Sequence, residues 1–162
     1  MKSLLILRHA QAAPESRALP DVQRPLTAYG RAQAQTLGTW LQQRGYLPDQ
    51  IVCSAAVRTR ETAEAVVAAA AWTTPVCSID RLYQASAAEL LSAARSQSAD
   101  VTQLLLVAHA PGVADFISLL TTQQMDASLM CEAGTLAEVA LDLARWSELG
   151  PGLGMLRLLL PP

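Results

Sequence analysis

The sequence contains few of the residues from which metal sites and disulfide scaffolds are built. Its 162 residues include two histidines and three cysteines, and the cysteines lie far apart, with no Cys-x-x-Cys pair among them. A structural zinc site is therefore not expected. Isolated cysteines in apolar surroundings are typical of buried, reduced thiols, which predicts a cytoplasmic protein.

Charge and long apolar runs are also scarce. The chain has 12 Lys and Arg residues against 14 Asp and Glu residues, a net charge of −2, so no basic field is available to attract nucleic acid. Any anion must be recognised locally. No stretch reaches the roughly 20 apolar residues that a membrane-spanning helix needs. Arg8 and His9 interrupt the N-terminal apolar run before it could form the core of a signal peptide. We expect a protein that binds neither nucleic acid nor membrane.

Apolar residues, by contrast, make up 51% of the chain, and only 16% of its residues are charged. This composition excludes a disordered chain and suits a sheet covered by helices on both faces. Residues 4–7 and 104–108 form two nearly continuous apolar runs, typical of strands buried on both faces. We predict a single α/β domain over residues 1–162, a three-layer α/β/α sandwich. Its central sheet is mostly parallel, with these two strands adjacent near the middle.

Shorter patterns predict the remaining elements. Further strands are expected at 50–54, 75–79, 136–143 and 155–160, and helices at 28–44, 56–71, 87–95 and 113–120. Thr27 is the expected N-cap of the first helix, and Gly45 its stop signal. Residues 10–26 hold three prolines and predict a long loop without regular structure, and a polar loop is expected from 121 to Gly134. Loops as long as the first are often functional.

Each of the two apolar strands ends in a histidine, His9 and His109. If the strands are parallel neighbours, both histidines emerge at the edge of the sheet where α/β proteins bind ligands. Arg8 precedes His9, Arg58 follows the strand at 50–54, and Arg24 lies at the end of the proline-rich loop. Taken singly, each is more readily a surface arginine or a turn histidine. Together they predict a phosphate pocket, because guanidinium groups suit phosphate oxygens and a neutral imidazole is a nucleophile.

Three motifs in this order resemble those of the histidine phosphatase superfamily, also called the phosphoglycerate mutase-like family. They are Leu7-Arg8-His9-Ala10, Ser54-Ala55-Ala56-Val57-Arg58-Thr59-Arg60-Glu61-Thr62 and Val107-Ala108-His109-Ala110-Pro111, so the resemblance covers essentially the whole chain. The short length and the segment Arg24-Pro25-Leu26-Thr27 resemble the SixA-type phosphohistidine phosphatases. The chain departs from the family at Ala10, where Gly is more common, and at Ala110, where Asn is more common.

The resemblance implies a role for each candidate residue. His9 would attack phosphorus and form a covalent phosphohistidine intermediate that water then hydrolyses. Arg8 and Arg58 would bind the phosphate oxygens, Arg24 would close the pocket, and His109 would donate a hydrogen bond to the transferring group. Such a transition state asks for positioning and charge stabilisation, so no metal or other cofactor is expected.

Larger members of the superfamily use an acidic residue to protonate the leaving group, and Asp80 and Glu89 lie in the matching region. Neither is an unambiguous counterpart. An imidazole leaves more readily than an alkoxide, so the expected activity is that of a phosphohistidine phosphatase. Its partner would be a phosphohistidine-containing protein, for example a histidine phosphotransfer domain, or a small phosphorylated substrate. Two alternatives stay open: a small-molecule phosphomonoesterase or mutase that uses Asp80 or Glu89 as its acid, and a phosphate-binding module without catalysis.

Overall fold

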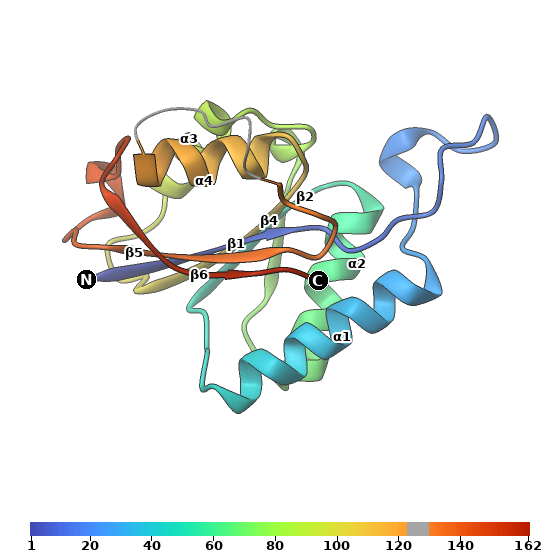
Figure 1. Ribbon diagram of the computed structural model, residues 1–162, viewed down its shortest axis with the longest axis horizontal. Coiled ribbons are helices and arrows are strands. Elements are labelled where there is room, and N and C mark those ends of the chain that lie inside the picture. The colour runs from blue at the N-terminus through green and yellow to red at the C-terminus, as the bar shows by residue number, and fades with distance from the viewer. Residues whose placement is uncertain (123–129) are drawn as a thin grey trace.

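The computed structural model describes residues 1–122 and 130–162, and it has the predicted three-layer architecture (Figure 1). Helices α1 (Ala28–Gln43) and α2 (Val57–Ala70) cover one face of a central sheet. Helices α3 (Ala87–Arg95) and α4 (Gly112–Thr122) cover the other face. None of the helices in these two ranges is both long and apolar enough to cross a membrane.

Six strands form the sheet. Their order is β3 (Val76–Ile79), β2 (Gln50–Ser54), β4 (Gln103–Ala108), β1 (Lys2–Arg8), β5 (Leu136–Leu141) and β6 (Gly154–Leu160). The pairs β1 with β4, β4 with β2 and β2 with β3 are parallel, whereas β5 runs antiparallel to both β1 and β6. The prediction of a mostly parallel sheet with β1 and β4 adjacent at its centre is confirmed.

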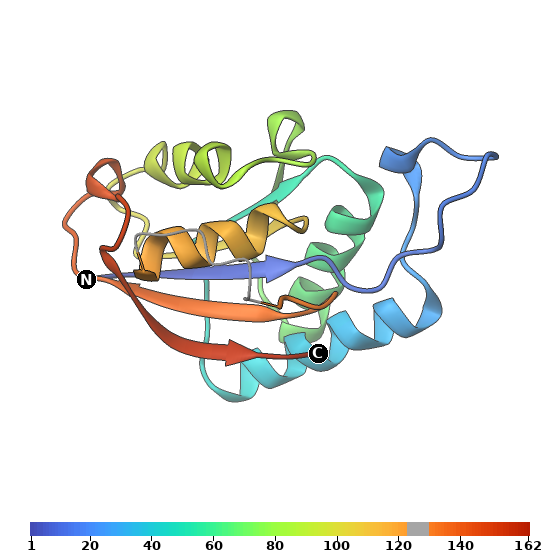
Figure 2. The same ribbon diagram turned by 45° about the horizontal axis from the view of Figure 1, so that its top comes forward.

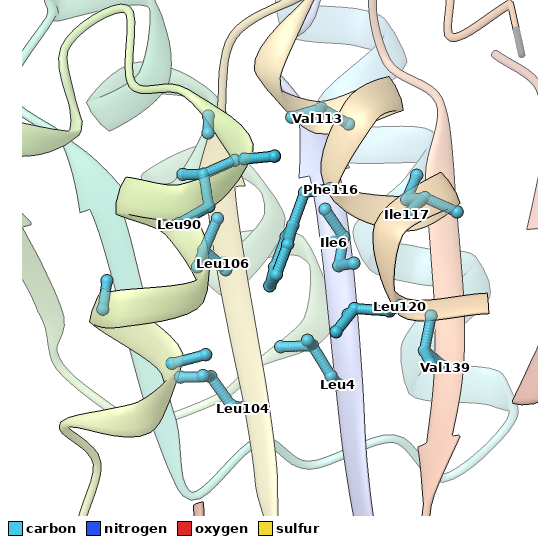
Figure 3. Close-up of a cluster of buried hydrophobic side chains, with 14 of the residues drawn as sticks. Leu4, Ile6, Leu90, Leu104, Leu106, Val113, Phe116, Ile117, Leu120 and Val139 are labelled. Atoms are coloured by element: carbon cyan, nitrogen blue, oxygen red, sulfur yellow. The ribbon is translucent and has the colours of Figure 1, made fainter. Parts of the chain in front are cut away.

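Burial on both faces explains why β1 and β4 have continuous apolar sequences. Alternate side chains of a strand point to opposite faces. Leu4, Ile6, Leu104 and Leu106 therefore pack beneath α3 and α4, around Phe116 (Figure 3). The intervening residues of both strands pack against α1 and α2 in a second cluster. Each fully buried leucine or isoleucine stabilises the fold by about 1.5–3 kcal/mol. The centre of the sheet, covered by helices on both faces, is therefore a rigid support for the residues that follow β1 and β4.

Most predicted boundaries hold to within two residues. The Thr27 side chain accepts a hydrogen bond from the Gly30 N–H at the start of α1, and Gly45 follows the helix with φ +73°. Glycine adopts this left-handed conformation without steric cost, which is why it stops the helix. The loop predicted from 121 to Gly134 falls partly on residues 123–129, which lie outside the described residues.

The prediction that residues 10–26 have no regular structure is wrong in part. Asp21–Gln23 form a 3₁₀ turn, in which the Gln23 N–H donates to Pro20 O and the Arg24 N–H to Asp21 O. Ala12 and Leu26 are joined by a single antiparallel bridge. Figures 1 and 2 show this segment, in blue, extending from the end of the sheet at which β1 finishes. Residues 10–26, which we call the arm, are therefore folded and lie beside the ends of the central strands.

Candidate active site

The parallel register of β1 and β4 places the two histidines side by side. Arg8 is the last residue of β1 and pairs with Ala108, the last residue of β4. The backbone N–H of His9 donates to Ala108 O at 3.0 Å. The rings of His9 and His109 consequently lie 5.3 Å apart between centroids. This geometry follows from the sequence, because both apolar runs end in histidine at the same level of the sheet.

The five predicted site residues line one pocket with a volume of about 370 Å³. Arg8 and His9 come from the end of β1, His109 from the end of β4, Arg58 from the first turn of α2, and Arg24 from the arm formed by residues 10–26. The remaining lining residues are Gln11, Ala12, Glu15, Asp21, Gln84, Ala110 and Ala133. Segments distant in sequence therefore supply one compact, strongly polar depression.

His9 is held in one tautomer. Its Nδ1 lies 2.8 Å from the carbonyl oxygen of Ala10, which can only accept a hydrogen bond. Nδ1 therefore carries the hydrogen of the neutral ring, and Nε2 keeps a free lone pair. Burial, followed by the positive charges of Arg58 and Arg8, lowers the His9 pKa from 6.5 to about 4. At neutral pH the ring is unprotonated at Nε2, which is the state that a nucleophile requires.

His109 is also neutral. Burial, together with the neighbouring His9 and Arg58, lowers its pKa from 6.5 to about 3. Its Nε2 lies 2.8 Å from the Oγ of Ser54, a hydroxyl that is fully buried at the end of β2. When Ser54 donates this hydrogen bond, the hydrogen of the His109 ring sits on Nδ1, which then acts as a donor. Tyr83 packs edge-on against the His109 ring, with 5.6 Å between centroids.

Buried nitrogens without a hydrogen-bond partner gather in this pocket. Within the described ranges they occur at Arg8 Nε, Arg58 Nε and His109 Nδ1. A buried polar group left unpaired costs about 1–3 kcal/mol, so such atoms are rare outside functional sites. All three residues line the same depression. The guanidinium groups of Arg8 and Arg58 can only donate, so these two residues and His109 offer hydrogen-bond donors suited to a tetrahedral oxyanion.

The candidate acids Asp80 and Glu89 do not line the pocket. Glu89 is exposed, and its carboxylate accepts hydrogen bonds from the backbone N–H and hydroxyl of Ser86 in a capping box at the start of α3. These bonds lower the Glu89 pKa and keep it ionised. Asp80 is exposed at the start of the 3₁₀ turn Asp80–Leu82. The acidic residues that do line the pocket are Asp21 and Glu15, both in the arm.

Asp21 is a site residue that the sequence did not reveal. Its Oδ2 accepts hydrogen bonds from Arg58 Nη2 at 3.0 Å and from the Tyr83 hydroxyl at 2.5 Å, and its Oδ1 accepts from Arg24 Nε at 2.8 Å. The Tyr83 hydroxyl and Arg58 lower the Asp21 pKa to about 2, so the carboxylate is ionised throughout the neutral range. The sequence shows that Asp21 lies three residues before Arg24, but no local sequence pattern indicates that the arm contacts Arg58.

The pocket offers no grouped metal ligands. Across residues 1–122 and 130–162, no three His, Cys, Asp or Glu side chains lie close enough together to hold a metal ion.

Comparison with known proteins agrees with this geometry. Residues 4–100 match the sequence profile of the histidine phosphatase superfamily (branch 1). The uncharacterized protein Rv1276c of Mycobacterium tuberculosis is 32% identical over 154 residues, which cover 93% of this chain and 86% of that protein.

Two solved structures are particularly informative. A protein of Nakamurella multipartitia, described as a candidate phosphohistidine phosphatase SixA, superposes with a TM-score of 0.84 at 30% identity, covering 99% of this chain and 96% of its own. The protein histidine phosphatase SixA complexed with tungstate shares the fold, with a TM-score of 0.77 at 21% identity and coverage of 98% and 96%. With paired histidines at the ends of β1 and β4 and arginines around them, this chain belongs to the histidine phosphatase superfamily and is similar in fold to its SixA-type members.

Proposed function

We propose that the protein is a phosphatase that hydrolyses phosphohistidine through a covalent intermediate on His9. The observation that carries this proposal is the state of His9: a buried ring with Nδ1–H held by Ala10 O, Nε2 unprotonated, and arginines on the same pocket. A histidine that merely bound phosphate by charge would be expected to be protonated. The arrangement suits nucleophilic attack instead.

The reaction follows from these positions. Phosphate oxygens receive hydrogen bonds from the guanidinium groups of Arg8 and Arg58 and from the His109 ring, while Arg24 adds positive charge from the arm. The lone pair of His9 Nε2 forms a bond to phosphorus as the bond from phosphorus to the leaving nitrogen breaks. Water then attacks phosphorus, the bond to Nε2 breaks, and inorganic phosphate leaves. Positioning and fixed charge supply most of the rate enhancement in such transfers.

The state of Asp21 and the positions of Asp80 and Glu89 support phosphohistidine as the substrate. Asp21 is ionised, since its pKa is about 2, and Asp80 and Glu89 lie outside the pocket. An alkoxide leaving group needs a proton from an enzymic acid, whereas an imidazole can leave already protonated. The similar protein from Nakamurella multipartitia, described as a candidate phosphohistidine phosphatase, agrees with this choice. The partner is then a cytoplasmic protein that carries phosphohistidine, such as a histidine phosphotransfer domain.

Trapping of the intermediate tests the proposal. The protein is mixed with a ³²P-labelled phosphohistidine peptide, quenched within milliseconds in alkali, and digested for peptide mapping. Acid-labile, alkali-stable label on the peptide that contains His9 is the expected result. Label on His109 alone, or phosphate release with no labelled peptide at any quench time, would contradict the covalent mechanism. His9→Ala serves as the matched control, because it removes the nucleophile but leaves β1 intact.

A further inference from the structure

We propose that Asp21 is a positioning residue that fixes the orientation of the Arg58 guanidinium in the phosphate site. The inference deepens the proposed function and rests on it, because it concerns the binding of the phosphoryl group in the same pocket. Asp21 belongs to the arm, 37 residues before Arg58 in the sequence. It is therefore the arm, and not the sheet alone, that completes the phosphate site.

Two separate acceptors of Asp21 hold the terminal nitrogens of Arg58. Arg58 Nη1 donates to the backbone oxygen of Asp21 at 2.7 Å, and Nη2 donates to its Oδ2 at 3.0 Å. Arg58 is only 3% exposed, so water cannot replace these bonds without a rearrangement. A guanidinium has five N–H donors, and the pair with Asp21 leaves Nε–H and further Nη–H groups free. The buried Nε has no other partner.

Asp21 itself is fixed from several directions. Arg24 Nε donates to Oδ1, and the Tyr83 hydroxyl donates to Oδ2, so both carboxylate oxygens are engaged. The backbone oxygen of Asp21 also accepts from the Arg24 N–H, which closes the 3₁₀ turn. Tyr83 further lies 6.0 Å from the Arg58 guanidinium carbon, measured to the ring centroid. The carboxylate therefore has a single orientation, and it imposes one on Arg58.

The charges favour positioning over competition with phosphate. The alternative role for a carboxylate paired with a phosphate-binding arginine is that of an internal plug, which occupies the arginine and is displaced when phosphate binds. Asp21, however, accepts only one hydrogen bond from each Nη atom of Arg58, so that three of the five guanidinium N–H donors are not used by Asp21. Phosphate bound to these donors leaves the contacts between Asp21 and Arg58 in place. Binding and positioning are compatible in one structure.

Calorimetric titration with inorganic phosphate tests the inference without any need for turnover. Asp21→Ala should weaken phosphate affinity by about 10- to 100-fold, the loss expected when a hydrogen-bonded charged partner is removed. Both variants keep the backbone oxygen that accepts from Arg58 Nη1, and Asp21→Asn also keeps one side-chain oxygen, so it should recover part of that loss. Asp100→Asn removes the same charge from an exposed position before β4, at the opposite end of the sheet, and should leave affinity unchanged.

A double-mutant cycle identifies the route of the effect. If Asp21 acts through Arg58, Asp21→Ala should cost little further affinity in an Arg58→Ala background. In steady-state assays of the parent and Asp21→Asn, we expect a raised KM together with a reduced kcat, because Arg58 contacts the phosphoryl group both before and during transfer. The Tm of each variant, measured in parallel, separates these effects from a loss of folded protein.

Several outcomes would overturn the inference. Tighter phosphate binding by Asp21→Ala would mean that the carboxylate competes for Arg58 and acts as a plug. If Asp21→Ala weakens phosphate binding as strongly in the Arg58→Ala background as in the parent, Asp21 acts through Arg24 or the arm alone. If Asp21→Ala does not fold, Asp21→Asn with unaltered phosphate affinity and kcat/KM also refutes the role. A parent protein that binds phosphate as described but turns over no phosphohistidine would refute the proposed function and leave the positioning role standing.

Discussion

His9 should remain unprotonated at pH values where an ordinary histidine is a cation. Its side chain is 9% exposed and lies near three arginines, and its pKa is about 4 instead of 6.5. At pH 5.5, a histidine with a pKa of about 4 is roughly 97% neutral, whereas one with the ordinary pKa of 6.5 is only about 9% neutral. The concentration of the nucleophilic form at this pH therefore differs about tenfold between the two cases.

The scarcity of histidine makes the measurement direct. With only two histidines in the chain, the ring Cε1–H signals are two, and a His109→Gln variant assigns them. We expect the His9 signal to titrate near pH 4 in the phosphate-free protein. Diethyl pyrocarbonate acylates only the neutral ring, so the observed rate constant for acylation of His9 should be nearly constant from pH 7.5 to 5.5. In Arg58→Gln the midpoint should rise, because one of the charges that depress the pKa is removed.

A midpoint near 6.5 would refute this description of His9, since it would mean that neither burial nor the arginines act on the ring. A ¹⁵N spectrum at pH 7 that shows the hydrogen on Nε2 would refute it in another way. In that tautomer the lone pair would face the Ala10 carbonyl, which contradicts the 2.8 Å hydrogen bond from Nδ1.

Three further predictions follow from the same structure. His9→Ala should reduce turnover by more than about 10³-fold while circular dichroism and Tm stay near the parent values, and residual turnover within tenfold of the parent would exclude His9 as nucleophile. The kcat/KM for phosphohistidine peptide should exceed that for phosphoserine peptide by at least about 10²-fold, because Asp21, the pocket carboxylate that binds Arg58, has a pKa of about 2 and cannot protonate an alkoxide. Near-equal values, together with loss of the phosphoserine activity in Glu15→Gln, would identify Glu15 as the acid. The free energy of unfolding should fall as pH drops from 6.5 toward 4, because the unfolded chain takes up protons that folded His9 does not; the loss from His9 alone is roughly 3 kcal/mol, and urea titrations of the parent and His9→Gln would show whether it occurs.

The sequence predicted the layers and the central strands because burial there leaves a strong local pattern. Residues covered on both faces must be apolar at every position, and both runs end in histidine at the same register. The arm at 10–26 left no comparable pattern, since its prolines and polar residues are equally consistent with an open loop. Its 3₁₀ turn depends on hydrogen bonds within four residues and on the contact between Asp21 and Arg58. That contact joins residues far apart in the sequence, so no local sequence pattern predicts it.

The same limit applies to the candidate acids. Asp80 and Glu89 lie in the right region of the sequence, but Glu89 caps α3 and Asp80 starts an exposed turn. The capping box Ser86 to Glu89 is itself visible in the sequence as a Ser followed three residues later by a Glu, and it would have argued against a catalytic role for Glu89. Placement of Glu15 and Asp21 at the pocket depended on how the arm folds back, which is a property of the whole molecule.

Arginine and histidine have different roles in this pocket, anion binding and nucleophilic attack, because they differ in protonation state. Attraction of a phosphate group requires positive charge, yet a nucleophilic imidazole must carry none. The guanidinium group is a permanent cation in proteins, so Arg8, Arg58 and Arg24 can hold the anion while a neighbouring histidine is neutral. The same charges, added to burial, keep His9 neutral. Asp21 accepts one hydrogen bond from each Nη atom of Arg58, so that one residue stabilises a buried cation while the pocket as a whole remains positive. Substrate attraction and nucleophile activation thus arise from one set of charges.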